Sequence, residues 1–187
     1  MNAPTEVPIQ IYAEATPNPA STKYNVNRKL LEGLGRDFPN VQSADGNPLA
    51  ATLFTIPGVT GVYIGPGFVT VTSATREWKN FDQMVIQSLE AHLKSGQKNV
   101  SDTPEAVKAM PKTEAEAAIK KILDEEIRPA VAQDGGDIIF AGFEQGTVYL
   151  QLRGSCNGCP SSLATLKFGI EQRLKMKVPD VEQVVAV

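Results

Sequence analysis

Hydrophobic and polar positions repeat in two different ways along the first half of this chain, and the two repeats predict both strands and helices. Short runs in which every second side chain is apolar or β-branched are typical of strands, because alternate side chains of a strand share a face. These runs are residues 9–14, 23–31, 59–64 and 68–72. The Gly-Pro-Gly sequence at 65–67 predicts a hairpin turn. Residues 78–94 carry apolar side chains at helical spacing, and Pro48 suits the first position of a short helix.

The second half of the chain predicts the element order α-β-β-α-β. Thr113 followed by Glu116 forms a capping box that begins a helix, and Pro129 is expected to kink or end that helix. Two strands, a second helix and a closing strand follow. Their expected places are residues 137–143, 148–152, 160–174 and 181–187.

A change in composition separates the two halves. Residues 95–112 contain Gly96, two prolines and several small polar residues without a sustained period, which is typical of a linker. We therefore predict the α+β fold class, with two small α+β domains at 1–94 and 113–187 joined by a flexible linker at 95–112.

Composition and charge exclude several classes of protein. The 187 residues include 18 basic and 21 acidic side chains, so the net charge of −3 argues against nucleic acid as the main partner. No apolar run approaches the ~20 residues of a membrane span, so no membrane association is expected. The first residues lack the pattern of a signal or transit peptide, which predicts a cytoplasmic protein with reduced thiols.

The candidate chemistry lies in the sequence Cys-Asn-Gly-Cys-Pro at 156–160. Cys156 and Cys159 are the only cysteines and His92 is the only histidine, which excludes a disulfide scaffold and a zinc site closed by one chain. Two thiols three positions apart can face one site, and Gly158 lets the turn between them adopt a positive φ. Because Cys159 precedes a predicted helix, the helix dipole is expected to lower its pKa.

A pair of cysteines at this spacing fits a redox dithiol, a zinc site or an iron–sulfur site. The redox alternative is typical of a βαβ context, whereas this pair follows the second strand of a predicted hairpin, which disfavours that alternative. Either metal site usually needs four protein ligands. Two chains with two thiolates each would supply them, so counting ligands predicts a homodimer with the metal on its two-fold axis.

Longer motifs surround the cysteines: Arg128-Pro129, Asp-Gly-Gly-Asp at 134–137, and Gly-Ser-Cys-Asn-Gly-Cys-Pro-Ser-Ser at 154–162. Together they resemble the C-terminal domain of the NifU/Nfu family of iron–sulfur scaffolds, over about residues 113–187. The first half, which includes ATPNPASTKY and NPLAATLFTIPGVTGVYIGPGFVTVT, resembles the Nfu N-terminal domain. The two-domain order is similar to the stand-alone Nfu type.

The resemblance implies a scaffold and carrier, which is not an enzyme. Such a protein binds a [4Fe-4S] cluster between two subunits, here through Cys156 and Cys159 of each chain, and passes it to apo iron–sulfur client proteins. It implies an upstream cluster donor and a homodimer in the holo form. Two cysteine pairs can also hold a [2Fe-2S] cluster. A dithiol–disulfide oxidoreductase and a zinc-bridged interaction module stay open as alternatives.

Four further features have simpler explanations. The Asp-Gly-Gly-Asp sequence at 134–137 predicts a tight helix-to-strand turn, with positive φ at both glycines and local hydrogen bonds to the aspartates. Residues 16–19 predict a rigid turn, with a partner-docking surface as the alternative. His92 is expected to interact with the dipole at a helix C-terminus. The basic residues at 167–177 predict a solvated helix face.

Overall fold

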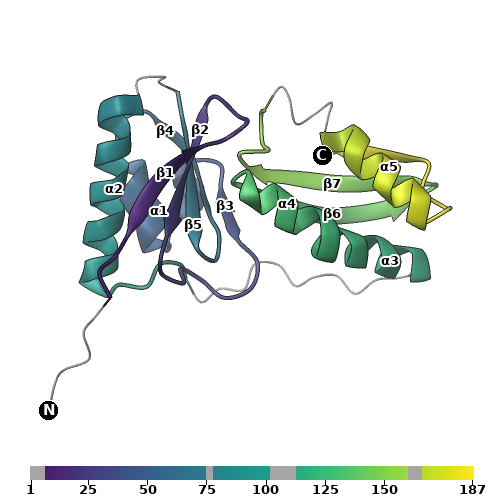
Figure 1. The fold of residues 1–187 in the computed structure, drawn as a ribbon, viewed down its shortest axis with the longest axis horizontal. Coiled ribbons are helices and arrows are strands. Elements are labelled where there is room, and N and C mark those ends of the chain that lie inside the picture. Colours follow the sequence, from purple (N-terminus) through teal and green to yellow (C-terminus); the bar gives the residue numbers. More distant parts are fainter. Residues whose placement is uncertain (1–6, 75–77, 102–112, 160–165) are drawn as a thin grey trace, which may run out of the picture.

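Two β-sheets organise the chain in the computed structural model, which describes residues 7–74, 78–101, 113–159 and 166–187. The first domain is built on a five-stranded sheet and the second on a three-stranded sheet, and the two lie beside one another (Figure 1). Each sheet has its own hydrophobic core. The predicted α+β class with two domains is therefore confirmed. Most of the predicted linker, residues 102–112, lies outside the described residues.

The strands of the first domain pair in the order β1-β2-β5-β4-β3, and every pair is antiparallel. Their bounds are β1 Ile11–Ala15, β2 Ser21–Val26, β3 Arg36–Phe38, β4 Val59–Ile64 and β5 Phe68–Ser73. The predicted hairpin is confirmed as β4 and β5. The strand expected at 23–31 instead begins at Ser21 and ends at Val26, and β3 was not predicted.

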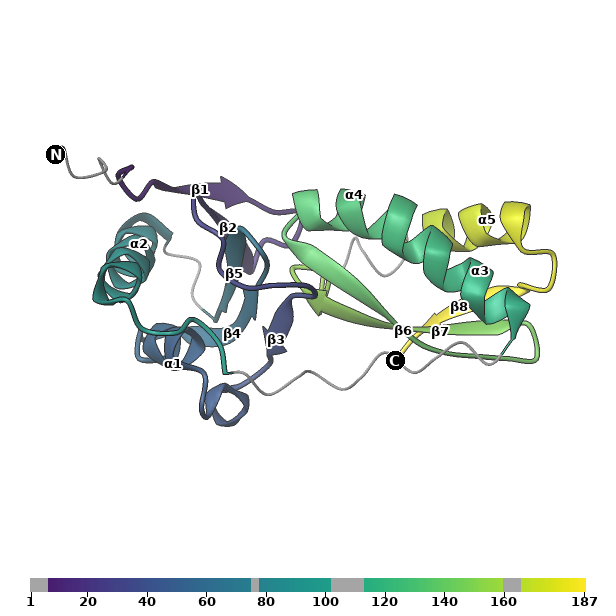
Figure 2. The ribbon, with the colours of Figure 1, turned by 90° about the horizontal axis from the view of Figure 1, so that it is seen from below.

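Two helices, α1 (Pro48–Phe54) and α2 (Trp78–Ser95), cover the face of the first sheet that lies away from the second domain (Figures 1 and 2). Pro48 stands in the first turn of α1, as predicted, and its helix buries Leu49 and Leu53 completely. Burial on this face removes apolar surface from water and holds the domain together.

His92 lies in the last turn of α2 and is buried. Burial lowers the pKa of this histidine below its ordinary value. His92 therefore stands at the C-terminal end of the helix, as expected, but the neutral imidazole is favoured there over the cation.

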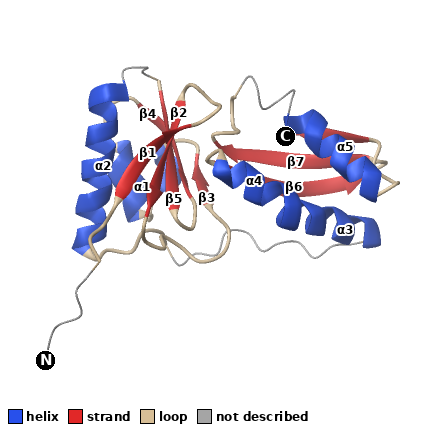
Figure 3. Ribbon diagram, in the orientation of Figure 1, coloured by secondary structure: helices blue, strands red, loops and turns tan. Residues whose placement is uncertain are grey.

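The second domain confirms the predicted order α-β-β-α-β. Its elements are α3 Glu114–Ile122, a π-helical turn Leu123–Ile127, α4 Arg128–Gln133, β6 Gly136–Glu144, β7 Thr147–Gly154, α5 Lys167–Lys177 and β8 Gln183–Ala186. β6 and β7 form an antiparallel hairpin, and β8 returns parallel to β7 after the crossover through α5. The helices cover one face of this sheet (Figures 2 and 3).

The first helix of this domain begins where it was predicted and ends later. The hydroxyl of Thr113 accepts a hydrogen bond from the Glu116 amide, at 3.1 Å. Pro129 does not end the helix, which continues as α4 to Gln133. The π-helical turn ends at Ile127, two residues before the proline. A wider turn makes room for the proline ring, which would clash with the carbonyl one ordinary turn earlier.

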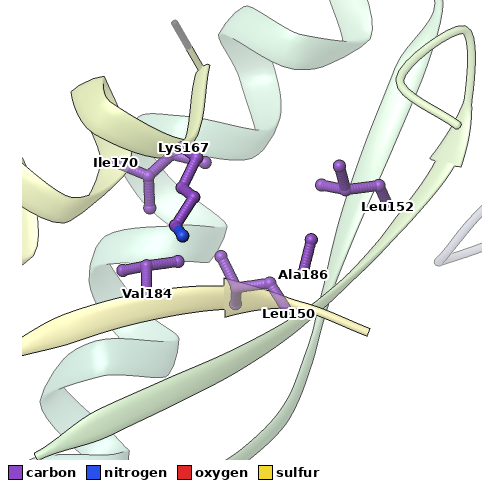
Figure 4. Close-up of a pocket in the computed structure, with 6 residues that line it drawn as sticks. All are labelled: Leu150, Leu152, Lys167, Ile170, Val184 and Ala186. Atoms are coloured by element: carbon purple, nitrogen blue, oxygen red, sulfur yellow. The ribbon is translucent and has the colours of Figure 1, made fainter. Parts of the chain in front are cut away.

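A small gap lies between helix α5 and the sheet, and Figure 4 shows the residues that line it. The gap beneath it has a volume of about 10 Å³, which is too small for anything larger than a single water. Its lining residues are Leu150, Leu152, Lys167, Ile170, Val184 and Ala186. On the outer side, Arg173 and Lys177 both pair with Glu126, which agrees with the predicted solvated basic face. The predicted start of this helix, at 160–165, lies outside the described residues.

None of the described helices combines the length and the apolar character that crossing a membrane would require.

Candidate functional site

The two cysteines stand on a tight loop that follows β7. The amide of Cys156 donates to the Arg153 carbonyl at 3.3 Å, and the amide of Asn157 donates to the Gly154 carbonyl at 3.1 Å. Gly158 has a φ of 71°, as its place between the cysteines predicted, and Gly154 has a φ of 60°. Only glycine adopts this conformation at little cost, so these two residues allow the loop to turn twice in six residues.

Both cysteine side chains line one cavity of about 420 Å³ at the edge of the second domain. They are nearly buried within the protein, with 5% of Cys156 and 1% of Cys159 exposed, and no disulfide joins them. The other walls are mostly apolar and come from the first domain, the π-helical turn, α4 and α5. They include Pro17, Ile127, Ala130, Val131, Leu166 and Ile170.

Burial raises the pKa of the Cys156 thiol to about 12. The negative charges of Asp134, Cys159 and Asp137 raise this pKa further, while a hydrogen bond with Ser155 opposes them. Cys156 is therefore protonated at neutral pH in the free chain. A metal ion that binds this sulfur must displace the proton, since the thiolate is the form that coordinates metals.

The Asp-Gly-Gly-Asp turn lies directly against the cysteine loop, a proximity that the sequence did not show. A Cβ added at Gly136 would lie 2.3 Å from the sulfur of Cys156. The amide of Ser155 donates to the Gly135 carbonyl at 3.1 Å. Positive φ was expected at both glycines, and this is wrong for Gly136: only Gly135 has it, at 78°. Gly136 is needed for space beside the sulfur.

Asp137, at the end of this turn, anchors the fold. Its carboxylate receives two hydrogen bonds of 2.8 Å from the guanidinium of Arg128 and one of 3.0 Å from the Tyr63 hydroxyl. It also accepts the Ile138 amide at 2.8 Å, which confirms the expected local hydrogen bond. Asp137 is buried and its carboxylate accepts all four of these hydrogen bonds. It therefore has a structural role, which is to hold the turn that lies beside the cysteine loop.

Four residues of the first domain form one cross-strand row on the sheet face that meets the second domain. Lys23 is opposite Thr70, Thr70 is opposite Tyr63, and Tyr63 is opposite Asp37, on β2, β5, β4 and β3 in turn. We call these four residues the cross-strand row. Each makes a hydrogen bond to the second domain. Their partners are the Gln133 carbonyl, the Gly135 carbonyl, the Asp137 carboxylate and the Gly154 amide.

Asn18, in the rigid turn between β1 and β2, completes this contact. Its side-chain amide donates to the Ser155 carbonyl at 3.0 Å and to the Asn157 carbonyl at 3.2 Å, so it bridges the residues on either side of Cys156. The turn predicted at 16–19 is therefore a docking surface for the other domain of the same chain.

Sequence reasoning missed these first-domain residues as parts of the site. The sequence offered only one local signal, which was polar residues within the predicted strands, such as Lys23 and Thr70. Such residues are expected to face solvent, whereas the structure buries both. His92 is the only histidine and could in principle bind a metal, but it lies in α2 of the first domain. In the part of the chain that the structure describes, no group of three or more His, Cys, Asp and Glu could hold a metal ion. Cys156 and Cys159 thus stay the predicted ligands.

Two family models match the chain. Residues 11–96 match the scaffold protein Nfu/NifU N-terminal model, and residues 119–185 match the NifU-like domain model. The chain is 41% identical to the human "NFU1 iron-sulfur cluster scaffold homolog, mitochondrial" over 93% of its own length and 70% of that protein. It is 40% identical to "NifU-like protein 4, mitochondrial" of Arabidopsis thaliana, over 93% of its own length and 64% of that protein. Both relatives carry a mitochondrial name, and the cytoplasmic location expected for this chain stays a prediction.

Proposed function

Because this chain belongs to the NifU/Nfu family of iron–sulfur cluster scaffold proteins, we propose that it carries a [4Fe-4S] cluster between two subunits and delivers it to apo-proteins. Cys156 and Cys159 of each chain are the proposed ligands. An upstream donor supplies the cluster, and client proteins with free cysteines receive it. The protein itself catalyses no covalent change of a substrate.

The observation that carries this proposal is the shared cavity of the two cysteines. One chain offers two thiols to this cavity, and thiolates are soft ligands that suit iron–sulfur clusters. A closed site for such a cluster usually needs four thiolates. Two chains that meet across their cavities supply this number, in keeping with the preference of homodimers for two-fold symmetry.

Transfer then proceeds by exchange of thiolates. A client thiol loses its proton and binds an iron, and one scaffold thiolate leaves that iron, so the number of iron–sulfur bonds is unchanged. The released scaffold sulfur takes up a proton.

Anaerobic reconstitution with iron and sulfide tests the proposal. We expect broad visible absorption, about four iron and four sulfide ions per dimer, and a mass of two chains in light scattering. About two of each ion per dimer would indicate a [2Fe-2S] cluster. A colourless zinc-bridged dimer would instead support the interaction module, and metal-free turnover of disulfide substrates would support the oxidoreductase.

Single substitutions test the ligands. Cys156→Ser and Cys159→Ser should each abolish stable cluster binding while the circular dichroism spectrum of the apo-protein stays unchanged, since each removes two of the four thiolates from a dimer. Asn157→Ala is the matched control, because it changes the exposed side chain between the two cysteines and leaves both sulfurs and the Asn157 backbone in place. A full cluster on either serine variant would refute the ligand assignment.

A further inference from the structure

We propose that the first domain positions the cysteine loop, and that Asn18 is the residue that fixes the turn around Cys156. The inference rests on the proposed function and concerns how long the cluster stays bound. It makes Asn18 a positioning residue, which acts on the cluster through the backbone of the loop.

The hydrogen bonds of Asn18 reach both sides of the cysteine. Its amide nitrogen donates to the carbonyls of Ser155 and Asn157, at 3.0 and 3.2 Å, and its oxygen accepts the Ala20 amide at 3.0 Å. Only 3% of Asn18 is exposed, so these carbonyls are held by a desolvated donor in place of mobile water. The amide thereby links the loop to a turn that side-chain hydrogen bonds of Thr16 and Asn18 hold in place.

The turn that carries Asn18 is held firmly in the first domain. The hydroxyl of Thr16 shares its one proton between the carbonyls of Asn18 and Ser21, at 2.9 and 3.0 Å, and accepts the Asn18 amide at 3.2 Å. Pro17 and Pro19 restrict the backbone on either side of Asn18. The donor is therefore in place before the cysteine loop docks on it.

A second route of contact leads from the cross-strand row to the same loop. The Thr70 hydroxyl donates to the Gly135 carbonyl at 2.7 Å, and this carbonyl also accepts the Ser155 amide at 3.1 Å. Ser155 is the residue before Cys156. Its hydroxyl donates to the Asp134 carbonyl at 2.6 Å, so both the backbone and the side chain of Ser155 depend on this turn.

Close packing shows that the two domains fit each other at these points. A Cβ added at Gly135 would lie 2.8 Å from the Thr70 hydroxyl, and one added at Gly154 would lie 3.1 Å from the Tyr63 ring. The loop and the turn therefore touch the first sheet with their backbones. Backbone contact fixes the path of the loop more firmly than flexible side chains could, because a backbone shift has to break several of these bonds at once.

The consequence concerns cluster release. A thiolate can leave the cluster only when the loop moves, and the first domain resists this movement. Removing the Asn18 donors leaves the Ser155 and Asn157 carbonyls to be satisfied by water and lets the loop sample more conformations. The cluster should still assemble on Cys156 and Cys159, but it should leave faster.

The test compares cluster loss from full-length variants. Holo-protein is mixed with excess ferrous chelator, and the decay of visible absorption gives the rate at a temperature well below unfolding. Asn18→Ala should lose the cluster about tenfold faster than the unchanged protein, as expected from two lost hydrogen bonds. Asn18→Asp keeps the shape but replaces the donors with acceptors, so its rate should rise at least as much.

Asn27→Ala is the matched control. The Asn27 side chain also bridges two backbone groups, the Pro8 carbonyl and the Gln10 amide, but it is exposed and both of these groups belong to the first domain. Its rate should equal that of the unchanged protein. Resonance Raman bands of the iron–thiolate bonds should shift in Asn18→Ala and not in Asn27→Ala, a signature that a general loss of stability would not give.

Each outcome decides the inference separately from the function. If the unchanged protein takes up no cluster, the proposed function fails. If it takes up a cluster and Asn18→Ala loses it at the same rate, or Asn27→Ala loses it equally fast, the positioning role is overturned while the function stands. If Asn18→Ala does not fold, Thr70→Val decides, since it keeps a β-branched residue in β5 and removes only the hydroxyl that holds Gly135.

Discussion

Gly136 lies so close to Cys156 that its missing side chain is part of the site. A Cβ at this position would lie 2.3 Å from the sulfur of Cys156, 3.2 Å from the Ser155 hydroxyl and 3.2 Å from a methyl group of Val131. Real atoms do not approach so closely, so the sulfur, the loop or the strand has to move when a methyl group is added.

The first prediction follows from this contact. Gly136→Ala should lower the free energy of unfolding by about 1–3 kcal/mol, the usual cost of overpacking, and should reduce the amount of cluster taken up on reconstitution. Urea denaturation and iron analysis measure the two effects. Gly142→Ala is the control in the same strand, because its Cβ would meet nothing closer than Tyr149 at 4.0 Å. Full cluster uptake by Gly136→Ala would contradict the prediction.

His92 supports a prediction about pH, because it is the only histidine in the chain. Its pKa is lowered by burial in the folded state, so the unfolded state takes up the proton first as the pH falls. The stability contributed by the neutral form is complete above the ordinary histidine pKa and is lost as the pH falls from there through the lowered pKa. The free energy of unfolding should therefore decrease between pH 7.5 and 5.5 (on the order of 1 kcal/mol per pH unit at most).

A variant separates this effect from the titration of carboxylates. In His92→Gln the decrease over the same pH range should be smaller, although the variant is less stable overall at pH 7.5. Chemical denaturation at several pH values gives both curves. Parallel curves would show that His92 has the same pKa in the folded and unfolded protein.

At the scale of elements, Arg128 joins the first helix of the second domain to its sheet. It begins α4, pairs bidentately with Asp137 in β6, and also bonds Asp124 in the π-helical turn at 3.0 Å. The side chains of Arg128 and Asp137 are 17% and 5% exposed. A buried ion pair that loses one partner leaves an uncompensated charge, which is more costly than the pair is favourable.

Arg128→Met should therefore lower the free energy of unfolding by about 3 kcal/mol, measured by urea denaturation. Arg173→Met is the matched control, since Arg173 also bridges two helical segments through a carboxylate, Glu126, but is half-exposed. Solvent screens that pair, and its loss should cost much less. If the two variants lost the same free energy of unfolding, burial of the Arg128 pair would not be the source of its contribution to stability.

The elements that sequence patterns predicted well are those whose stabilising contacts are local. The hairpin of β4 and β5 is marked by its turn and by β-branched residues, and α1 by Pro48 and two apolar residues one turn apart. β3 was missed because only Phe38 of its three residues is apolar, and the strand exists through its pairing with β4. Of the two outcomes expected at Pro129, a kink or an end, the helix does not end there, because a π-helical turn with no clear sequence signal accommodates the proline.

At the scale of the whole molecule, the cysteine pair was predictable and its surroundings were not. Cys156, Cys159 and the positive φ of Gly158 follow from a short motif. The hydrogen bonds from Thr70 and Asn18 join residues 65 to 139 positions apart. No local period encodes such contacts. They arise because the two domains, each with its own core, meet through polar side chains. The pairing of neighbouring strands brings four of these side chains into one row, namely Lys23, Asp37, Tyr63 and Thr70.

Tyr63 tests whether this row couples the two domains. Its hydroxyl donates to the Asp137 carboxylate at 3.0 Å in a buried position, so Tyr63→Phe removes one donor and keeps the ring. We expect a loss of about 1–2 kcal/mol in the free energy of unfolding. Hydrogen exchange should accelerate in both domains, in β4 and also in β6 and the cysteine loop, because Asp137 holds the start of β6. Tyr12→Phe, at an exposed position in β1, should change neither quantity. Faster exchange confined to β4 would mean that the sheet of the first domain does not support the site across the interface.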